Sequence, residues 1–452
     1  MKIEERTKSI ASTGFVRGSF LYLFGGVVNA VLGLVVLPIF TRFLSPDDYG
    51  ILATSTVLVQ VFTIVLGFNG WGLIARSHFD DDADSQRRLL STNIIFAGAL
   101  SVPLVGILVL LQGLTETFTK FPGAWLPVVV LVTLFGVVRT NYLSLVQAQS
   151  RPKHYVVVQS LGTALELGLG VVFVVLLGMR WEGRMLAIVI SAFVITLFCL
   201  YAMTFWMHLL RPIFDQKSLV LLLNFGVPLI PHFIGGWVMT MAPRLYMNNM
   251  ATVADTGLFS VAFNLASPIA LVIGAANQAY WPTLFSKLSN PSLDRVRLSR
   301  LLLLAVAVLP LCAIAYGIFV RYLLPLIVGP RFYGATDYVI WFALAFAFQG
   351  IYFIFGNFVI YSKRTTLIAW RADFLGGVIV MMVCPLLIYF NGPIGAAQAI
   401  MLGFAVSVVG CFTASRKAYP MPWRDALLSL AQGPFSVLRK DWTTMKDRES
   451  EQ

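Results

Sequence analysis

Apolar stretches of about 18 or more residues recur along the whole length of the chain, and each could cross a hydrocarbon core of roughly 30 Å as an α-helix. The polar segments between them are short. Charged residues make up only 12% of the chain, whereas soluble domains carry about 25%. We therefore predict an all-α polytopic membrane protein rather than a globular domain with one anchor.

The apolar runs and the loops between them predict about 12 membrane spans. The expected spans are 16–40, 50–72, 89–112, 124–148, 154–178, 185–208, 219–242, 256–279, 301–324, 335–360, 368–390 and 393–414. The division between the last two rests on the turn signal Asn391-Gly392-Pro393.

The distribution of positive charge predicts the orientation. If the N-terminus is inside, the inner segments hold 24 of the 33 Lys and Arg residues and the outer segments hold seven. This imbalance places both termini in the cytoplasm. Inner loops facing anionic lipid also account for the net charge of +12, so the charge requires no nucleic-acid partner.

One turn segment occurs twice. The run from Arg42 to Gly50 ends with Asp-Asp-Tyr-Gly between two apolar spans, and a weaker echo ends with Asp-Thr-Gly at Gly257. The second glycine follows the first by nearly half the chain, with six spans between the repeats. An even number gives both halves the same orientation, so we predict two six-helix bundles related by a pseudo-twofold axis along the membrane normal.

The repeat also sets the expected domains and caps. The predicted organisation is an N-terminal lobe at 1–212, a C-terminal lobe at 213–414 and a basic cytoplasmic tail at 415–452. In each repeat the aspartate, Asp48 or Asp255, is expected to be the N-cap of the following helix, and the glycine to ease the tight entry. The tail contains an amphipathic stretch around Trp423, which suits either an interfacial helix or a disordered end.

At this point the sequence resembles a known family. The run Leu37 to Gly50 is similar to the N-terminal signature of Wzx-type oligosaccharide flippases, which belong to the multidrug/oligosaccharidyl-lipid/polysaccharide exporter superfamily. The opening of the seventh span, Asn224 to Pro231, is similar too, as is Arg244 ahead of the second repeat. The family usually has an acidic residue just before this arginine, where this chain has Ala242-Pro243.

The resemblance implies a transporter rather than an enzyme, without a cofactor or a metal. Such flippases carry an oligosaccharide, usually linked to undecaprenyl diphosphate, from the inner to the outer leaflet of the bacterial inner membrane for O-antigen, capsule or exopolysaccharide assembly. The implied fold is a V of two bundles that opens alternately to either side. A polysaccharide polymerase and chain-length machinery are the implied protein partners, beside membrane lipid.

A diphosphate cargo requires cations in a hydrated cavity, and arginine suits phosphate because its fork donates two hydrogen bonds. The candidates within or near spans are Arg139, Arg244, Arg17 and Arg371. Those near span ends could instead snorkel to the interface, and Arg139 could form a buried ion pair.

Two further sets of polar residues and helix breakers are candidates. Asn29 and Asn224 could bind sugar hydroxyls or bond helix to helix, whereas Glu166 and Asp373 could bind H⁺ or Na⁺. Glu166 could instead pair with a buried arginine such as Arg139. The predicted hinges, which kink the first span of each lobe, are Gly33, Pro38, Pro228 and Pro231.

Two other functions compete with the flippase. The first is a multidrug exporter of the same superfamily, which a cavity lined by arginine would oppose. The second is a membrane-embedded polysaccharide polymerase or glycosyltransferase, but the chain has no sizeable loop to hold a donor or acceptor. The acidic run at 80–84 lacks the spacing of a calcium loop, and we expect it to be solvated.

Overall fold

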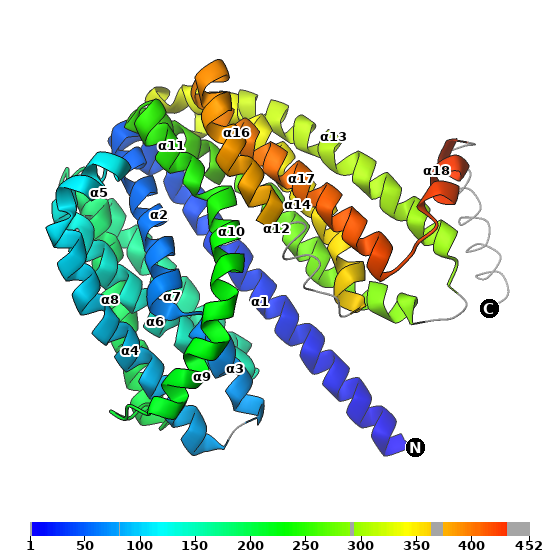
Figure 1. The fold of residues 1–452 in the computed structure, drawn as a ribbon, viewed down its shortest axis with the longest axis horizontal. Helices are drawn as coiled ribbons and strands as arrows, with labels where there is room; N and C mark the ends of the chain where they lie inside the picture. The colour runs from blue at the N-terminus through cyan, green and yellow to red at the C-terminus, as the bar shows by residue number, and fades with distance from the viewer. Residues whose placement is uncertain (1, 81, 290–292, 363–373, 432–452) are drawn as a thin grey trace.

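The computed structural model describes residues 2–80, 82–289, 293–362 and 374–431, and within them the chain is helical with no strand (Figure 1). Ten described helices are long and apolar enough to cross a membrane. The last of these, Leu375–Ala418, is a hairpin of two helices that reverses at Gly392, and a bent helix pair adds one more candidate span. The twelve predicted spans are therefore all present in this part of the chain.

The N-terminal lobe contains the first six spans. Its helices are α1 (Lys2–Phe43), α2 (Pro46–Gly67), α3 (Gly70–Asp80), α4 (Ala83–Leu110), α5 (Gln112–Thr119), α6 (Leu126–Ala148), α7 (Pro152–Val171) and α8 (Trp181–Tyr201). Short π-helical turns, Val172–Leu176 and Ala202–Trp206, extend α7 and α8. Helix α6 lies at the centre of the lobe, in contact with α2, α3, α4 and α8, whereas α1 packs mainly on α7.

The C-terminal lobe follows the same plan. Its helices are α9 (Gln216–Gly226), α10 (Ile230–Thr240), α11 (Ala242–Met250), α12 (Val253–Leu288), α13 (Arg295–Ile327), α14 (Thr336–Tyr361), α16 (Leu375–Asn391) and α17 (Gly395–Ala418). Helix α14 is central and packs on α12, α13 and α17. Edge-to-face aromatic pairs, including Phe259 on Phe342, fill the space between α12 and α14.

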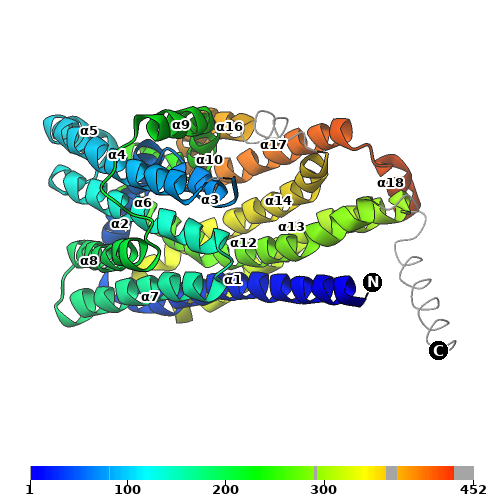
Figure 2. The same ribbon diagram turned by 90° about the horizontal axis from the view of Figure 1, so that it is seen from below.

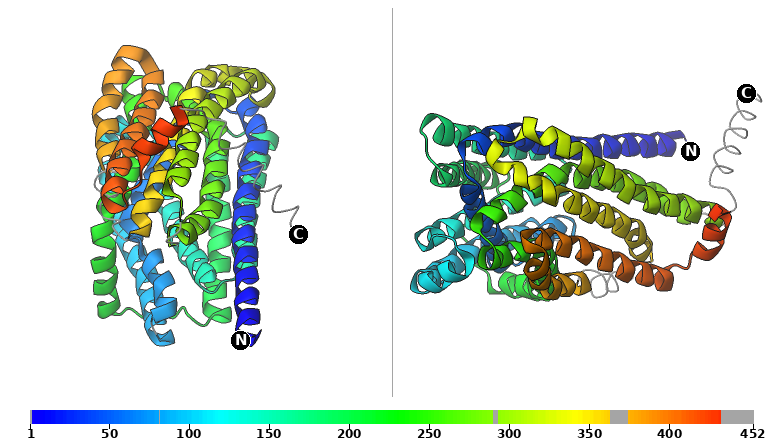
Figure 3. Two further views of the ribbon diagram at one scale, coloured as in Figure 1. Left: turned by 90° about the vertical axis from the view of Figure 1, so that its right-hand side faces the viewer. Right: turned by 90° about the horizontal axis from the view of Figure 1, so that it is seen from above.

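The two lobes meet at one end and diverge toward the other, as Figure 1 shows. Figure 2 shows the same helices from below, with α1 and α7 side by side. At the shared end α2 packs on α12, α11 meets α5, and α1 meets the 3₁₀ turn at Pro330–Ala335. The N-terminal end of α1 lies at the far, open end (Figure 3). The molecule is thus a V whose closed end is formed by the first turns of α2 and α12.

The two repeats touch each other at this closed end. A Cβ on Gly50 would overlap the backbone of Val253, and a Cβ on Gly257 would overlap the backbone of Pro46. The contact is reciprocal, because Val253 and Gly257 stand at the same spacing in their repeat as Pro46 and Gly50. Glycine at these two positions permits the close backbone approach of α2 and α12.

The prediction that Asp48 and Asp255 are N-caps is wrong by three residues. The N-caps are Ser45 and Thr252, and each aspartate is the third helical residue of a capping box, bonding back to the backbone of its cap. Asp48 is buried and also lies 3.2 Å from Arg180 Nε. In each repeat the hydroxyl of the cap residue accepts from the backbone N–H of the aspartate, and the carboxylate of the aspartate accepts from the backbone N–H of the cap.

Buried hydrogen bonds join the lobes at the closed end. Asn248 Nδ2 on α11 donates to Thr54 Oγ1 on α2 at 2.8 Å and to the carbonyl of Thr119 at the end of α5 at 2.7 Å. Thr256 Oγ1 donates to Asn248 Oδ1 at 2.7 Å. In the other half, the Gly329 N–H donates to Thr41 Oγ1 at 3.1 Å. The bonds of Asn248 with Thr54 and Thr119, and of Gly329 with Thr41, cross between the lobes and so depend on the closed end.

The seventh span is bent by 46° between Gln216–Leu229 and Phe233–Met250, which confirms the predicted kink. Pro228 lies in the 3₁₀ turn Val227–Leu229 and Pro231 lies at the start of α10. Before the bend, α9 packs on α3 and α4 of the N-terminal lobe; after it, α10 and α11 pack on α16. The span therefore crosses from one lobe to the other at its bend.

The first span differs from the seventh. Helix α1 runs from Lys2 to Phe43 without a break, although Pro38 lies inside it. Unlike Pro228 and Pro231, Pro38 therefore does not interrupt the helix. At the other end of the chain, helix α18 (Trp423–Ala431) packs on α13, with Trp423 buried against Phe355 and Phe358. This part of the tail is thus docked on the lobe through its aromatic anchor.

Candidate functional site

Two cavities lie between the lobes. The one nearer the closed end has a volume of about 450 Å³, and the one farther along α2 has about 510 Å³. We call the first the arginine cavity, because its lining includes Arg184 and Arg244, and the second the aromatic cavity, because its lining includes Trp71 and Trp237. Gln60 of α2 lines both, so the two are adjacent.

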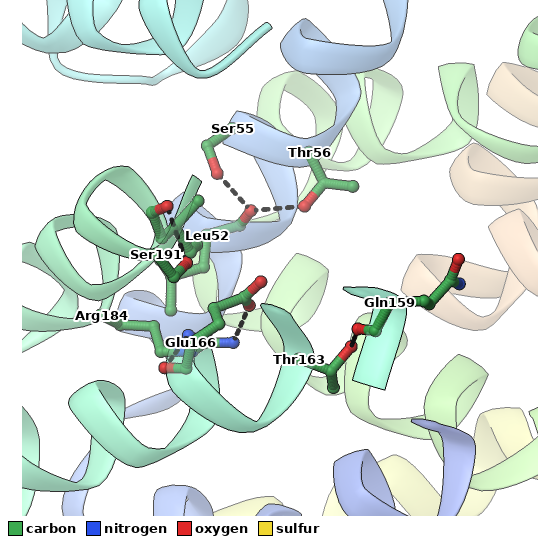
Figure 4. A network of polar contacts seen from close by, with 9 residues as sticks. Leu52, Ser55, Thr56, Gln159, Thr163, Glu166, Arg184 and Ser191 are labelled. Atoms are coloured by element: carbon green, nitrogen blue, oxygen red, sulfur yellow. Dashed lines mark hydrogen bonds and ion pairs between the residues drawn. The ribbon is translucent and has the colours of Figure 1, made fainter. Parts of the chain in front are cut away.

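The arginine cavity contains an ion pair from two neighbouring helices of the N-terminal lobe. Arg184 Nη2 on α8 donates to Glu166 Oε1 on α7 at 2.6 Å, and Nη1 lies 3.3 Å from the Glu166 carbonyl (Figure 4). The guanidinium also lies 5.1 Å from the ring centroid of Phe40 on α1. The side chain of Arg184 is 13% exposed and that of Glu166 is 31% exposed, so the pair is accessible from the cavity.

Arg244 enters the same cavity from the opposite lobe. Its guanidinium is packed against the faces of Phe259 and Phe263 on α12, at 5.3 and 5.1 Å from the ring centroids. Nη1 donates to the Thr240 carbonyl at 2.6 Å, and Nε lies 3.4 Å from Ser260 Oγ. Within the described residues no carboxylate lies in ion-pair range of this buried cation.

The electrostatics of the arginine cavity follow from these groups. Its described lining carries two guanidinium groups and one carboxylate, and the rest is apolar or neutral. A buried cation next to aromatic faces keeps part of its charge uncompensated, because aromatic quadrupoles neutralise it only weakly. The cavity therefore presents net positive charge at a site shared by both lobes.

The aromatic cavity has a different character. Its described lining contains no charged side chain, and aromatic, amide and hydroxyl groups lie there beside a few aliphatic residues. It is lined by Gln60, Thr63, Ile64, Asn69, Trp71, Phe233, Gly236, Trp237, Met239, Thr240, Gln349, Tyr352, Phe404 and Ser407. Residues from α2, α3, α10, α14 and α17 are combined here, so both lobes contribute.

Of the predicted substrate-binding residues, Arg244 lines a cavity between the lobes. Arg139 is half-buried within the N-terminal lobe, where its guanidinium lies next to Gly162 of α7. It lines neither cavity. Asn29 donates to the Gly25 carbonyl of its own helix at 2.8 Å. Asn224 is exposed on α9, outside both linings.

The remaining predicted residues fall into two groups. Gly33, a predicted hinge, lines the arginine cavity, as does Glu166, a predicted ion site, whose partner is Arg184 rather than Arg139. Arg371 and Asp373 lie outside the described residues, and so does the side chain of Arg17.

Sequence reasoning missed Arg184 and the aromatic cavity. Arg184 directly precedes the expected span 185–208, so it counts among the seven basic residues of the outer segments. The sequence did indicate that they could meet, because Glu166 and Arg184 stand in consecutive spans joined by a short loop, and such spans are neighbours. The aromatic cavity combines five helices, and no local pattern indicates it.

Comparisons with known proteins agree with this architecture. A model of the family described as polysaccharide biosynthesis protein matches residues 15–288. The Lsg locus putative protein 1 of Haemophilus influenzae is 25% identical over 361 residues, covering 78% of this chain and 86% of that protein.

Solved structures share the fold. The lipid II flippase MurJ in an inward closed conformation superposes with a TM-score of 0.73 at 13% identity, covering 90% of this chain and 89% of MurJ. An inward-facing multidrug resistance MATE family transporter of the MOP superfamily gives a TM-score of 0.65 at 13% identity, with 91% and 95% covered. All three therefore share one fold over most of their length.

Proposed function

The chain belongs to the polysaccharide biosynthesis protein family, and we propose that it is a flippase that moves a polyprenyl-diphosphate-linked oligosaccharide from the inner to the outer leaflet. The observation that carries the proposal is the arginine cavity, in which Arg184 and Arg244 approach one space from different lobes. The solved flippase MurJ, whose fold this chain shares, acts on lipid II, as its name states.

The chemistry of the cavity fits a diphosphate. Arg244 is held by a backbone carbonyl and two aromatic faces, and no carboxylate competes for its charge among the described residues. A guanidinium in this state can donate paired hydrogen bonds to phosphate oxygens. A diphosphate bridging Arg184 and Arg244 would contact both lobes, so its binding would be sensitive to their relative position.

The V shape supplies the route. If the excess of Lys and Arg faces the cytoplasm, the open end with the start of α1 faces inward and the closed end faces outward. A head group would enter from the inner leaflet while the polyprenyl tail stays in the bilayer. Separation of α2 from α12, together with a change of the 46° bend, would then expose the cavity to the outer side.

A coupling ion is part of the same proposal. Glu166 forms an ion pair with Arg184. Binding of H⁺ or Na⁺ to this carboxylate would release the guanidinium for phosphate, and loss of the ion would favour product release. The chemistry thus links the ion gradient to the affinity of the cavity for its anionic cargo.

The direct test is deletion of the gene in its host, with lipid-linked oligosaccharide followed by mass spectrometry and surface polymer followed by gel electrophoresis. We expect complete repeat units to accumulate on the polyprenyl carrier while O-antigen, capsule or exopolysaccharide is lost from the surface. Incomplete units would instead indicate an enzyme of glycan assembly. A polymerase and chain-length proteins in the inner membrane would be the expected partners.

A multidrug exporter is the second candidate, because the fold is also that of a MATE family transporter. Cationic drugs would meet Arg184 and Arg244 in the arginine cavity, which disfavours this function. Unchanged surface glycan together with new drug sensitivity in the deletion strain would support it.

A further inference from the structure

We propose that the aromatic cavity binds the uncharged sugar rings of the cargo next to its diphosphate. This inference rests on the proposed function, because it assigns the second part of the same substrate. It starts from the adjacency of the two cavities, which share Gln60 on α2. A head group whose diphosphate occupies the arginine cavity would extend its first sugars past Gln60 into the aromatic cavity.

The aromatic side chains suit sugar rings. Trp71, Trp237 and Tyr352 enter the cavity from α3, α10 and α14, and Trp71 is 45% exposed. Flat apolar faces with a negative quadrupole pack well against the C–H face of a pyranose. Trp237 is oriented by its indole N–H, which lies 3.3 Å from the Val57 carbonyl of the opposite lobe.

Three amide side chains supply unused hydrogen-bonding groups. Gln60 and Gln349 make no hydrogen bond to the part of the chain that the structure describes, although both are half-buried. Asn69 is 8% exposed, and its Nδ2 has no partner there either. A buried donor without a partner is costly, and hydroxyl groups of a sugar would satisfy these amides, which both donate and accept.

The turn between α2 and α3 positions Asn69. Phe68, the C-cap of α2, and Asn69 both have positive φ, at 44° and 52°. Left-handed residues commonly end helices, and asparagine tolerates this conformation. Here the turn places the amide of Asn69 and the ring of Trp71 on the lining of one cavity.

The charge of the two cavities is separated. The described lining of the aromatic cavity is uncharged, whereas both arginines and the carboxylate lie in the arginine cavity. A sugar carboxylate in the aromatic cavity would lose water without gaining a cation, which is unfavourable. The cavity should therefore favour neutral hexoses or acetamido sugars over uronic acids at the positions next to the diphosphate.

The test uses the full chain in lipid nanodiscs and three probes: bare undecaprenyl diphosphate, undecaprenyl-diphosphate-glucose and undecaprenyl-diphosphate-glucuronic acid. We expect the glucose probe to bind about tenfold more tightly than the bare probe, and the glucuronic acid probe to gain nothing. Trp71→Ala and, independently, Gln349→Leu should remove the gain from glucose and leave binding of the bare probe unchanged. Trp206→Ala, an exposed tryptophan outside both cavities, is the matched control.

The outcomes separate this inference from the proposed function. Tight binding of the bare probe without a gain from glucose would overturn the inference and leave the flippase proposal standing. An equal gain from glucuronic acid, or a gain that survives both cavity variants, would also overturn it. Failure of the wild-type protein to bind any of the three probes would overturn the proposed function and the inference with it. If Trp71→Ala does not fold, Gln349→Leu decides.

Discussion

At the scale of single residues, the arginine cavity contains two guanidinium groups in unlike settings. Arg184 is neutralised by a carboxylate at 2.6 Å, whereas Arg244 is packed between aromatic faces and bonded to a carbonyl. The two should therefore respond differently to mutation. Arg244 offers its positive charge to an anion directly, whereas the charge of Arg184 is compensated by Glu166.

Arg244→Gln should lower the affinity of the protein for undecaprenyl diphosphate by at least tenfold, because a hydrogen bond to a charged group is worth about 1.5–3 kcal/mol. Arg139→Gln should have a smaller effect, since Arg139 lines neither cavity. Arg331→Gln, at an exposed arginine, is the matched control. Binding in nanodiscs checks the order, and an equal loss from Arg139→Gln would show that the diphosphate binds inside the N-terminal lobe.

Glu166→Gln should raise the affinity for inorganic pyrophosphate several-fold, because it leaves the Arg184 guanidinium without its carboxylate. Titration calorimetry of wild type and variant measures the effect. Unchanged affinity would mean that the pair has only a structural role.

The sequence indicated some of these residues but not their partners. Glu166 stood out as a carboxylate within an apolar span, and Arg244 through the family resemblance and its place near a span end. The pairing of Glu166 with Arg184 depends on how α7 and α8 are rotated about their axes, which spacing alone leaves open. The amides of the aromatic cavity are ordinary helix residues in the sequence, and only the assembly of both lobes places them together.

At the scale of helices, apolar runs were sufficient to predict the spans. A segment that crosses lipid must satisfy its own backbone hydrogen bonds, so an apolar run of that length is a helix. The ends of the helices were less predictable. Short helices such as α3 and α5 continue beyond the apolar runs, and the N-caps are the hydroxyl residues Ser45 and Thr252. The kink of the seventh span followed from its prolines, whereas Pro38 leaves α1 unbroken.

Gly50→Ala and Gly257→Ala should weaken the closed end, because each added methyl group would overlap backbone of the opposite repeat. Gly33→Ala is the matched control, since a Cβ there meets nothing within 4 Å. A cysteine at Thr54, buried in the wild type, should react faster with a membrane-impermeant thiol reagent in the first two variants than in the control. Equal labelling in all three would show that the glycine contact does not hold this end closed.

The bend of the seventh span should be needed for turnover rather than for binding. Pro228→Ala combined with Pro231→Ala restores backbone donors and favours a straighter helix. We expect the double variant to bind undecaprenyl diphosphate normally and to transport it several-fold more slowly. Pro310→Ala, at a proline inside α13, controls for the loss of a proline from a span. Normal transport in the double variant would exclude a hinge at this bend.

At the scale of the whole molecule, two similar lobes meet through the same surface of each repeat. The offset between the two Asp-Xaa-Gly segments predicted the two bundles, and the reciprocal contacts of Gly50 and Gly257 show how the repeats meet. Sequence did not show which end of the V is closed. That depends on bonds between lobes, such as those of Asn248 with Thr54 and Thr119.

Locking these bonds should stop the cycle. Cysteines at Asn248 and Thr54, whose Nδ2 and Oγ1 atoms lie 2.8 Å apart in the wild type, should be joined by a short, reducible bifunctional thiol reagent that holds the lobes together at this end. Cross-linked protein should bind undecaprenyl diphosphate but not transport it, and reduction should restore transport. Transport by the fully cross-linked protein would mean that the lobes need not separate here.

The central claim is that the protein itself carries a lipid-linked oligosaccharide across the bilayer. The most direct measurement reconstitutes the purified full chain in liposomes that contain a fluorescent undecaprenyl-diphosphate oligosaccharide, and follows its exposure to a glycosidase added outside. The account predicts that wild-type protein makes the inner pool accessible and that Arg244→Gln protein does so at least tenfold more slowly. An inner pool that stays protected from the glycosidase with folded wild-type protein, under an imposed H⁺ or Na⁺ gradient of either direction, would contradict it.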